Sequence, residues 1–170
     1  DIRALCPKLS IGQIKNANWI GPISRIKKLH LQVDNDIVII LSGPEPQRTI
    51  LEDLLLKQIA QLQTYSIVFV RGSDKSMLYN CDNLKNVSFY NVATGKVIEN
   101  LLNRSRLLIA RSGYTTIMDI HHLDIKAIWI PTPGQTEQEY LAQVHSAQKN
   151  YLSIRQDYIN DLKKYIRQLI

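Results

Sequence analysis

The sequence is poor in the features that mark several classes of protein. Its two cysteines, Cys6 and Cys81, are too few and too far apart for a disulfide framework or a cysteine metal site. We therefore expect a reducing compartment, the cytoplasm. No apolar run approaches the roughly 20 residues that a helix needs to cross a bilayer. Internal repeats and low-complexity tracts are lacking too. These features exclude a disulfide-stapled miniprotein, a collagen-like repeat and a membrane-spanning helix.

The 170 residues contain 45% hydrophobic and 21% charged residues, which suits one globular domain with a single well-packed core. Lysine and arginine outnumber the acids by 21 to 15, a net charge of +6. This surplus favours anionic partners: nucleotides, acidic lipid headgroups or nucleic acid. The first residue is Asp rather than Met, and no signal peptide precedes it. We expect a fragment of a longer protein.

Short apolar runs alternate with segments of helical periodicity. The runs cover residues 37–41, 67–70, 107–110 and 127–130, and the helical segments cover 49–62, 97–102, 115–123, 137–148 and 157–169. Continuous apolar runs are typical of strands buried on both faces, as in parallel sheets. Alternation of strand and helix predicts right-handed crossovers. The fold class is therefore α/β, a Rossmann-like doubly wound parallel sheet.

The first thirty-odd residues differ from the rest. Residues 19–23 read as a short strand or edge segment that ends in a Gly-Pro turn. We predict that residues 1–26 are a linker and lead-in segment from an N-terminal domain, and that residues 27–170 form the α/β domain.

Ligands of an open parallel sheet bind beyond the carboxyl ends of its strands, so the loops after the runs are the candidate sites. The first, residues 42–48, reads Ser-Gly-Pro-Glu-Pro-Gln-Arg. Gly43 lets the backbone approach a ligand, and Arg48 adds positive charge. The loop lacks the GxGxxG and GxxxxGK[ST] patterns, which disfavours dinucleotides and P-loop ATP binding. A rigid turn with a solvated Arg48 is the alternative.

The second loop, residues 111–116, reads Arg-Ser-Gly-Tyr-Thr-Thr and leads into a helix. Hydroxyls at Ser112 and Thr115, a flexible Gly113 and the charge of Arg111 together suit a diphosphate. An ordinary helix cap explains the hydroxyls, although not the arginine. Asp119 lies one turn further on, where it could accept a hydrogen bond from a ribose, or simply favour the first turn of the helix.

The third loop, residues 131–140, is rich in proline, glycine and polar residues. Gln135, Gln138 and Glu139 provide the amide and carboxylate groups that sugar hydroxyls require. A capping box of Thr136 and Glu139 accounts for part of this pattern, but not for the glutamines.

The remaining polar and charged features of the sequence give weaker evidence of a functional site. The neighbours His121 and His122 point apart on a helix and have no third ligand at a suitable spacing, so we expect no metal site. The acidic pair at 34 and 36 precedes its strand, which favours a turn. Basic residues at 163, 164 and 167 form a solvated helix face. Peripheral contact of this face with an anionic membrane is the minority interpretation.

Two motifs carry a family resemblance. Residues 111–119 (Arg-Ser-Gly-Tyr-Thr-Thr-Ile-Met-Asp) and residues 130–142, which include Gln138 and Glu139, resemble the C-terminal half of GT-B glycosyltransferases. Family 28, which includes the N-acetylglucosaminyltransferase of lipid II synthesis, is the most similar, together with a group of uncharacterised bacterial predicted glycosyltransferases. The resemblance runs from about residue 18 to residue 142.

The resemblance implies a role for each predicted site residue. It assigns Ser42, Gly43, Ser112, Gly113, Tyr114 and Thr115 to the donor diphosphate, Asp119 to the ribose, Gln138 and Glu139 to the donor sugar, and Tyr90 and Val92 to the uracil. The loop chemistry adds Arg48 and Arg111 to the diphosphate group and Gln135 to the sugar group. Three departures from the family are prolines at 44 and 46, Asp119 in place of Glu, and Glu139 where Gln is frequent.

The resemblance also implies a function. The domain would bind a UDP-sugar, UDP-N-acetylglucosamine among the candidates, for inverting transfer to an unidentified acceptor. The acceptor site and the catalytic base would belong to an N-terminal domain, and this fragment alone would be inactive. Neither a cofactor nor a metal is expected. The alternatives are half of a nucleotide-sugar epimerase and a non-catalytic donor-binding subunit of a split transferase. Dispersed basic residues and the lack of a known motif disfavour nucleic acid.

Overall fold

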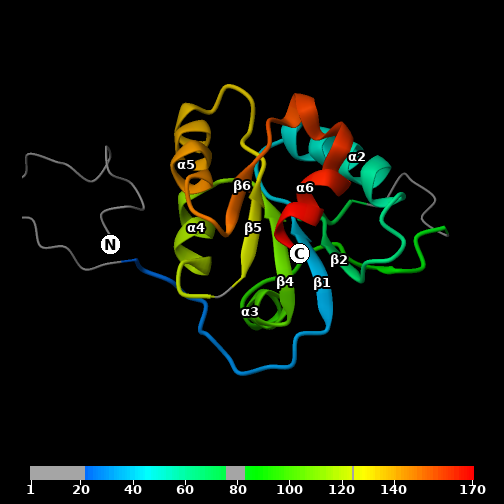
Figure 1. The fold of residues 1–170 in the computed structure, drawn as a ribbon, viewed down its shortest axis with the longest axis vertical. Helices are drawn as coiled ribbons and strands as arrows, with labels where there is room; N and C mark the ends of the chain where they lie inside the picture. The colour runs from blue at the N-terminus through cyan, green and yellow to red at the C-terminus, as the bar shows by residue number, and fades with distance from the viewer. Residues whose placement is uncertain (1–21, 76–82, 124) are drawn as a thin grey trace, which may run out of the picture.

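The computed structural model describes residues 22–75, 83–123 and 125–170. Their centre is a six-stranded sheet of order β3-β2-β1-β4-β5-β6, in which every neighbouring pair is parallel (Figure 1). The strands are β1 (Asn35–Ile40), β2 (Ile67–Val70), β3 (Val87–Tyr90), β4 (Ser105–Ala110), β5 (Lys126–Trp129) and β6 (Tyr151–Ser153).

Helices cover both faces of this sheet. They are α2 (Gln47–Ile59), α3 (Lys96–Asn103), α4 (Tyr114–Ile120), α5 (Thr136–Ser146), the 3-10 helix η2 (Gln156–Asp161) and α6 (Leu162–Leu169). Apolar residues of α2, η2 and α6 pack on one face, and those of α3, α4 and α5 pack on the other. The predicted Rossmann-like doubly wound α/β fold is confirmed.

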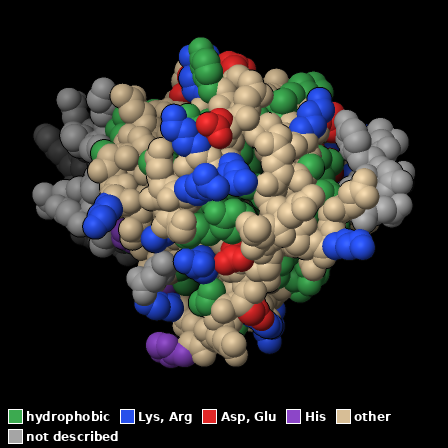
Figure 2. All heavy atoms as spheres, turned by 45° about the vertical axis from the view of Figure 1, so that its right-hand side comes forward, with side chains coloured by type: hydrophobic (Ala, Val, Ile, Leu, Met, Phe, Trp, Pro, Cys, Tyr) green, Lys and Arg blue, Asp and Glu red, His purple; other side chains and the backbone are tan. Residues whose placement is uncertain are grey.

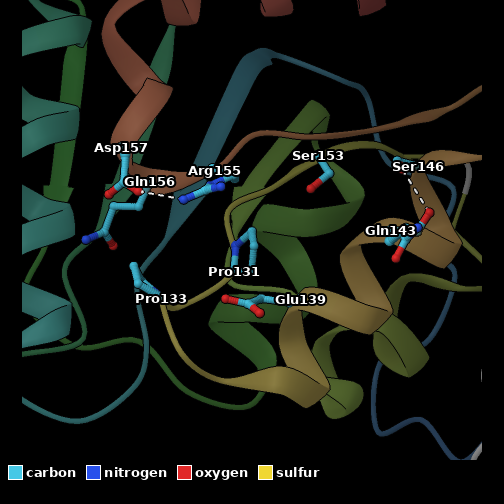
Figure 3. A pocket seen from close by; sticks show the side chains of 9 residues that line it. All are labelled: Pro131, Pro133, Glu139, Gln143, Ser146, Ser153, Arg155, Gln156 and Asp157. Carbon is cyan, nitrogen blue, oxygen red and sulfur yellow. Dashed lines mark hydrogen bonds and ion pairs between the residues drawn. The ribbon is translucent and has the colours of Figure 1, made fainter.

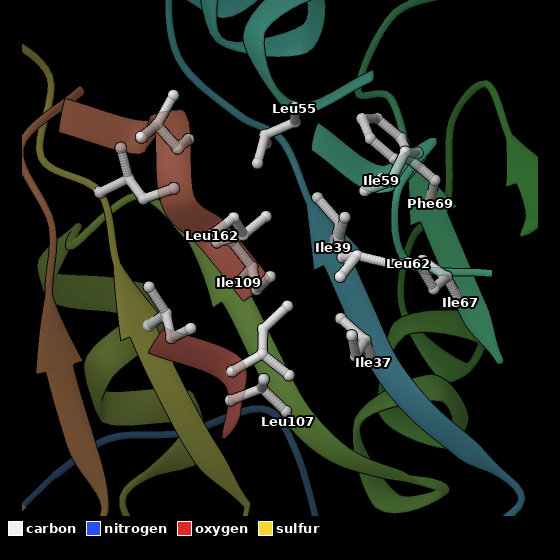
Figure 4. Close-up of a cluster of buried hydrophobic side chains, with 14 of the residues drawn as sticks. Ile37, Ile39, Leu55, Ile59, Leu62, Ile67, Phe69, Leu107, Ile109 and Leu162 are labelled. Atoms are coloured by element: carbon white, nitrogen blue, oxygen red, sulfur yellow. The ribbon is translucent and has the colours of Figure 1, made fainter. Parts of the chain in front are cut away.

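The two-sided burial of the central strands explains their continuous apolar sequence. In β1, Ile37 and Ile39 point into the layer under α2 and α6, whereas Val38 points into the opposite layer, and all three are 0% exposed. Figure 4 shows Ile37 and Ile39 beside Leu55 of α2 and Leu162 of α6. Burying each such side chain stabilises the fold by about 1.5–3 kcal/mol, so these layers hold the sheet rigidly below the loops.

Two strands lie outside the predicted set. β3 alternates half-buried and exposed residues, and β6 has only three residues. Both are edge strands, so neither shows the continuous apolar run that identified the central strands. Residues 19–21 of the segment predicted as a short strand lie outside the described residues, and residues 22 and 23 have no regular structure.

The entry segment, residues 22–34, follows the domain surface without forming a helix or strand. Ile26 is buried in the apolar layer formed with α3, α4 and α5. The backbone N–H of Lys27 donates to Glu99 and that of Leu29 donates to Asn103, both on α3. This segment therefore packs against the domain before β1 begins.

The order of the strands reverses between β1 and β4. The connection after β1 leads to α2 on one face, and the connection after β4 leads to α4 on the other (Figure 1). Such a topological switch point leaves a crevice at the carboxyl ends of the strands, where ligands of this architecture bind. Two of the three loops selected from the sequence flank this point, and the third follows β5.

Candidate functional site

Direct hydrogen bonds join the three predicted loops. Nη2 of Arg111, directly after β4, donates to the carbonyl of Gln47 at the start of α2 at 2.9 Å. The hydroxyl of Ser112 donates to the carbonyl of Gln138 in α5 at 2.7 Å. The predicted diphosphate and sugar residues therefore meet at the carboxyl ends of the strands, through contacts between residues that are 64 and 26 positions apart in the sequence.

Arg111 is a buried brace among these loops. It is 2% exposed, and Nη1 donates to the carbonyls of Ile130 and Pro131, while Nη2 also donates to Oε1 of Gln156 at 2.7 Å. Burial lowers the pKa of its guanidinium to about 10, which leaves it charged at neutral pH. Its Nε has no hydrogen-bond partner within the described part of the chain. Arg111 thus places positive charge beneath the loops of the switch point and is almost fully shielded from solvent.

The loop after β1 divides into an exposed and a buried part. Ser42 and Gly43 are exposed, and Gly43 adopts a φ of 110°, a conformation that side chains rarely permit. Glu45 accepts hydrogen bonds from Thr49 and from Arg48, which lower the pKa of its carboxyl to about 2. Residues 42–46 are all exposed, but the Glu45 carboxylate is already bonded to the first turn of α2, which leaves Ser42 and Gly43 for a ligand.

Arg48 belongs to a buried ion-pair network. It is 4% exposed and contacts Glu52 at 2.7 Å. Arg71, which follows β2, also donates to Glu52, and its Nη1 donates to Oδ1 of Asn91 at 2.9 Å. The network ties α2 to the segments after β2 and β3. Arg48, predicted for the diphosphate, is thus engaged inside the protein.

Sequence reasoning missed Glu52 and Arg71. The available signal was an acid within the apolar stripe of a helix and an arginine directly after an apolar run. The predicted uracil residues, Tyr90 and Val92, flank Asn91 and are 39% and 56% exposed. Tyr90 also lines a cavity of about 430 Å³ between β3 and α3. The network therefore fixes the backbone that carries the predicted uracil residues.

The polar residues of the loop after β4 differ in solvent exposure. Ser112 is 0% exposed and acts as a brace through its bond to α5. Gly113 has extended backbone and precedes α4, which no side chain caps. Tyr114 and Thr115 are exposed. The surface available to a ligand here runs from Gly113 to Thr115.

Asp119 lies on α4 beneath the entry segment. Its Oδ1 accepts a hydrogen bond from the Ser24 hydroxyl at 3.0 Å, and its Oδ2 accepts one from Nε of Arg25 at 3.4 Å. The Asp119 side chain is 8% exposed, whereas that of Arg25 is 76% exposed. Each carboxylate oxygen retains a further lone pair for another donor. Ser24 and Arg25 were not among the residues that the sequence predicted for the site.

Side chains from the first turn of α5 accept hydrogen bonds from the backbone of the loop before this helix. Oε1 of Gln138 accepts the Thr132 N–H at 2.9 Å, and its Nε2 donates to Oε1 of Gln135 at 2.6 Å. Glu139 accepts the Gly134 N–H at 3.1 Å. The three predicted sugar residues therefore lie together and hold the loop in one conformation.

A cavity of about 430 Å³ opens between α5 and the segment that joins β6 to η2. Figure 3 shows Glu139 and Pro131 on one side of it and Arg155 and Ser153 on the other. Of the predicted sugar residues, Glu139 lines this cavity. Arg155 was not predicted from the sequence.

Among the residues that the structure describes, no cluster of three or more His, Cys, Asp or Glu side chains could hold a metal ion. The ring of His122 contacts the carbonyl of Ile26 at 2.7 Å, which anchors the entry segment. Metal-independent binding stays a prediction.

Comparison with known proteins identifies the domain. Residues 37–170 match the model of the glycosyltransferase family 28 C-terminal domain. The chain belongs to this family. The predicted resemblance to the C-terminal, donor-binding domain of a GT-B glycosyltransferase is thereby confirmed. No curated protein matches the chain.

Solved glycosyltransferases share the fold of this family 28 domain. The glycotransferase of kitacinnamycin matches with a TM-score of 0.74 and 13% identity, over 98% of this chain and 44% of that one. SnogD from Streptomyces nogalater gives 0.56 and 15%, over 91% and 38%. The spinosyn forosaminyltransferase SpnP gives 0.58 and 14%, over 90% and 40%. The chain thus spans about two fifths of these enzymes.

The charged surface of the family 28 domain is mixed. On the face drawn in Figure 2, Lys and Arg side chains lie in separate groups, and acidic side chains adjoin several of them. Within the described ranges, no helix combines the length and apolar character needed to cross a membrane. Peripheral contact with an anionic membrane stays a prediction.

Proposed function

We propose that this domain binds the nucleotide-sugar donor of a glycosyltransferase, a UDP-sugar, in the crevice between β1 and β4. The observation that carries the proposal is the meeting of the three loops at the switch point, through Arg111 and Ser112. Membership of family 28 supports a transferase rather than an epimerase.

The diphosphate would lie over the exposed backbone of two loops, Ser42–Gly43 and Gly113–Thr115. Arg111 would act from below, since its guanidinium is charged and buried with no carboxylate beside it in the described structure. Arg48 would contribute through the ion-pair network that supports the first loop. Fixed positive charge of this kind would replace a metal ion in stabilising the leaving diphosphate.

The ribose would be recognised by Asp119. The spare lone pairs of its carboxylate can accept two hydroxyl donors, provided that the exposed Arg25 above it moves or shares the site. Arg25 would then lie close enough to add a second positive charge beside the nucleotide. The uracil would lie toward Tyr90 and Val92, beyond the end of β3.

Transfer itself would require a second domain. The chain covers 38–44% of the glycosyltransferase structures that it resembles, so we propose an N-terminal partner domain that holds the acceptor and the catalytic base. That base would deprotonate the acceptor hydroxyl, which would attack the anomeric carbon as UDP leaves, with inversion.

The Gln138→Ala variant tests the sugar assignment. Gln138 closes the loop before α5, so its loss should weaken binding of UDP-N-acetylglucosamine several-fold and leave binding of UDP unchanged. Isothermal titration calorimetry with both ligands measures this difference. Equal losses for the two ligands would reduce the site to a general nucleotide pocket.

A further inference from the structure

The cavity between α5 and the β6–η2 segment has a carboxylate on one wall and an ion pair on the other. Glu139 lines the α5 wall, where it accepts one backbone N–H and makes no ion pair with any residue that the structure describes. On the other wall, Nη2 of Arg155 donates to Oδ2 of Asp157 at 3.1 Å. The Arg155 side chain is 72% exposed, and its guanidinium carbon lies 5.5 Å from the centroid of the Tyr158 ring.

The rest of the lining suits a polyhydroxylated ring. Ser153 and Gln143 add hydroxyl and amide groups, which both donate and accept hydrogen bonds, and Pro131 adds an apolar face. A sugar presents hydroxyl groups at its edge and C–H groups on its faces, so it needs this combination. The volume of about 430 Å³ lies within the range of small-molecule sites.

The cavity adjoins the switch point through one side chain. Gln156 lines the cavity, accepts a hydrogen bond from Arg111 at 2.7 Å and donates to Oε1 of Gln47 at 3.3 Å. A ligand with its diphosphate over the switch-point loops would therefore have this cavity next to it.

We propose that this cavity binds the sugar ring of the donor and that Arg155 is a specificity-determining residue there. Arg155 donates hydrogen bonds to an acceptor group of the sugar, a hydroxyl or an amide carbonyl, and Glu139 accepts from a hydroxyl on the opposite edge. Asp157 holds the guanidinium in place. This inference rests on the proposed function, since it concerns the sugar end of the same ligand.

Calorimetry on the Arg155→Gln variant tests the assignment, with UDP, UDP-glucose and UDP-N-acetylglucosamine as ligands. Loss of the guanidinium should raise the Kd of the UDP-sugar that the wild type binds best by about five-fold or more. The Kd of UDP should stay within about two-fold. Arg167→Gln on α6 is the matched control, because it removes the same charge away from the cavity, and it should change neither Kd.

Backbone amide spectra of the isotope-labelled chain give a second readout. The amide signals of residues 153–155 should shift on addition of the preferred UDP-sugar and stay in place with UDP alone. Unchanged or equally weakened binding in Arg155→Gln would overturn the inference, as would the absence of these shifts. Failure of the wild type to bind UDP at all would instead overturn the proposed function.

Discussion

At the scale of single residues, burial separates the predicted site residues into two groups: buried residues that hold the loops in place, and exposed residues that a ligand can reach. Arg48, Arg111 and Ser112 are nearly inaccessible and hold loops in place. Gly43 and Thr115 are at the surface, where a ligand can reach them. Residue type alone could not distinguish these groups, because an arginine beside a glycine-rich loop suits both roles.

Asp119 gives the sharpest prediction at this scale. The Asp119→Asn variant keeps an acceptor for Ser24 but loses the charge, so we expect UDP affinity to fall by about 10- to 100-fold, the equivalent of roughly 1.5–3 kcal/mol. Titration calorimetry measures this, and thermal melts should show little change in stability. Asp161→Asn is the control, because it removes the charge of an exposed acid at the end of η2 that lines neither of the two cavities described above. Unaltered UDP binding in Asp119→Asn would assign Asp119 to structure alone.

Glu45 gives a prediction about pH. Its carboxyl has a pKa of about 2 in the folded state, lowered from 4.5 chiefly by hydrogen bonds from Thr49 and Arg48. A lowered pKa stabilises the folded state above the unfolded value, and this contribution disappears as pH falls toward 2. The difference in free energy of unfolding between wild type and Glu45→Gln should therefore be largest at neutral pH and shrink between pH 4.5 and 2. Urea denaturation across this range measures it, and a constant difference would contradict the assignment.

At the scale of elements, apolar pattern predicted the central strands and the core helices. The four buried strands show continuous apolar runs. The predicted helical segment 157–169 has its apolar residues spaced along one face, and these are buried against the sheet: Ile159, Leu162, Ile166 and Leu169. The apolar pattern did not predict the edge strands β3 and β6, because each has a neighbouring strand on one side only and its residues stay partly exposed. The kink inside η2 at Tyr158, where the backbone leaves helical values, also has no apolar signature.

The candidate site could be predicted from the sequence only in part, because local patterns reveal loops but not contacts between distant segments. Loops at strand ends are recognisable from Gly, Pro and polar residues, and this located all three. The contacts Asp119–Arg25 and Arg71–Asn91 join segments that are 94 and 20 residues apart, and no local pattern encodes such pairs. Long-range pairing appears only once the sheet has brought the segments together.

A core substitution tests the role of α6 as a cover for the sheet. Leu162 is 0% exposed, so Leu162→Ala should lower the free energy of unfolding by about 2–5 kcal/mol. Lys164→Ala, at an exposed position of the same helix, should change it by about 0.5 kcal/mol or less. Urea denaturation followed by circular dichroism compares the two. Similar effects from both variants would mean that α6 does not contribute to the core as described.

At the scale of the whole molecule, the sheet brings the three candidate loops together at the carboxyl ends of its strands, and we propose that the catalytic base belongs to another domain. The net charge of +6 favours an anionic ligand, and the three loops at the switch point carry polar residues that such a ligand requires. The domain is therefore expected to bind donor without transferring the sugar.

Binding of UDP by the wild-type chain tests the central claim most directly. We expect calorimetry to show saturable binding of UDP, even if only with millimolar affinity, roughly −4 kcal/mol, and weaker or no binding of NAD. The UDP affinity should be the same in EDTA and in magnesium or manganese, because the fixed charges of the site replace a metal. Preference for NAD over UDP, or binding of UDP that EDTA abolishes and a divalent metal restores, would contradict the account.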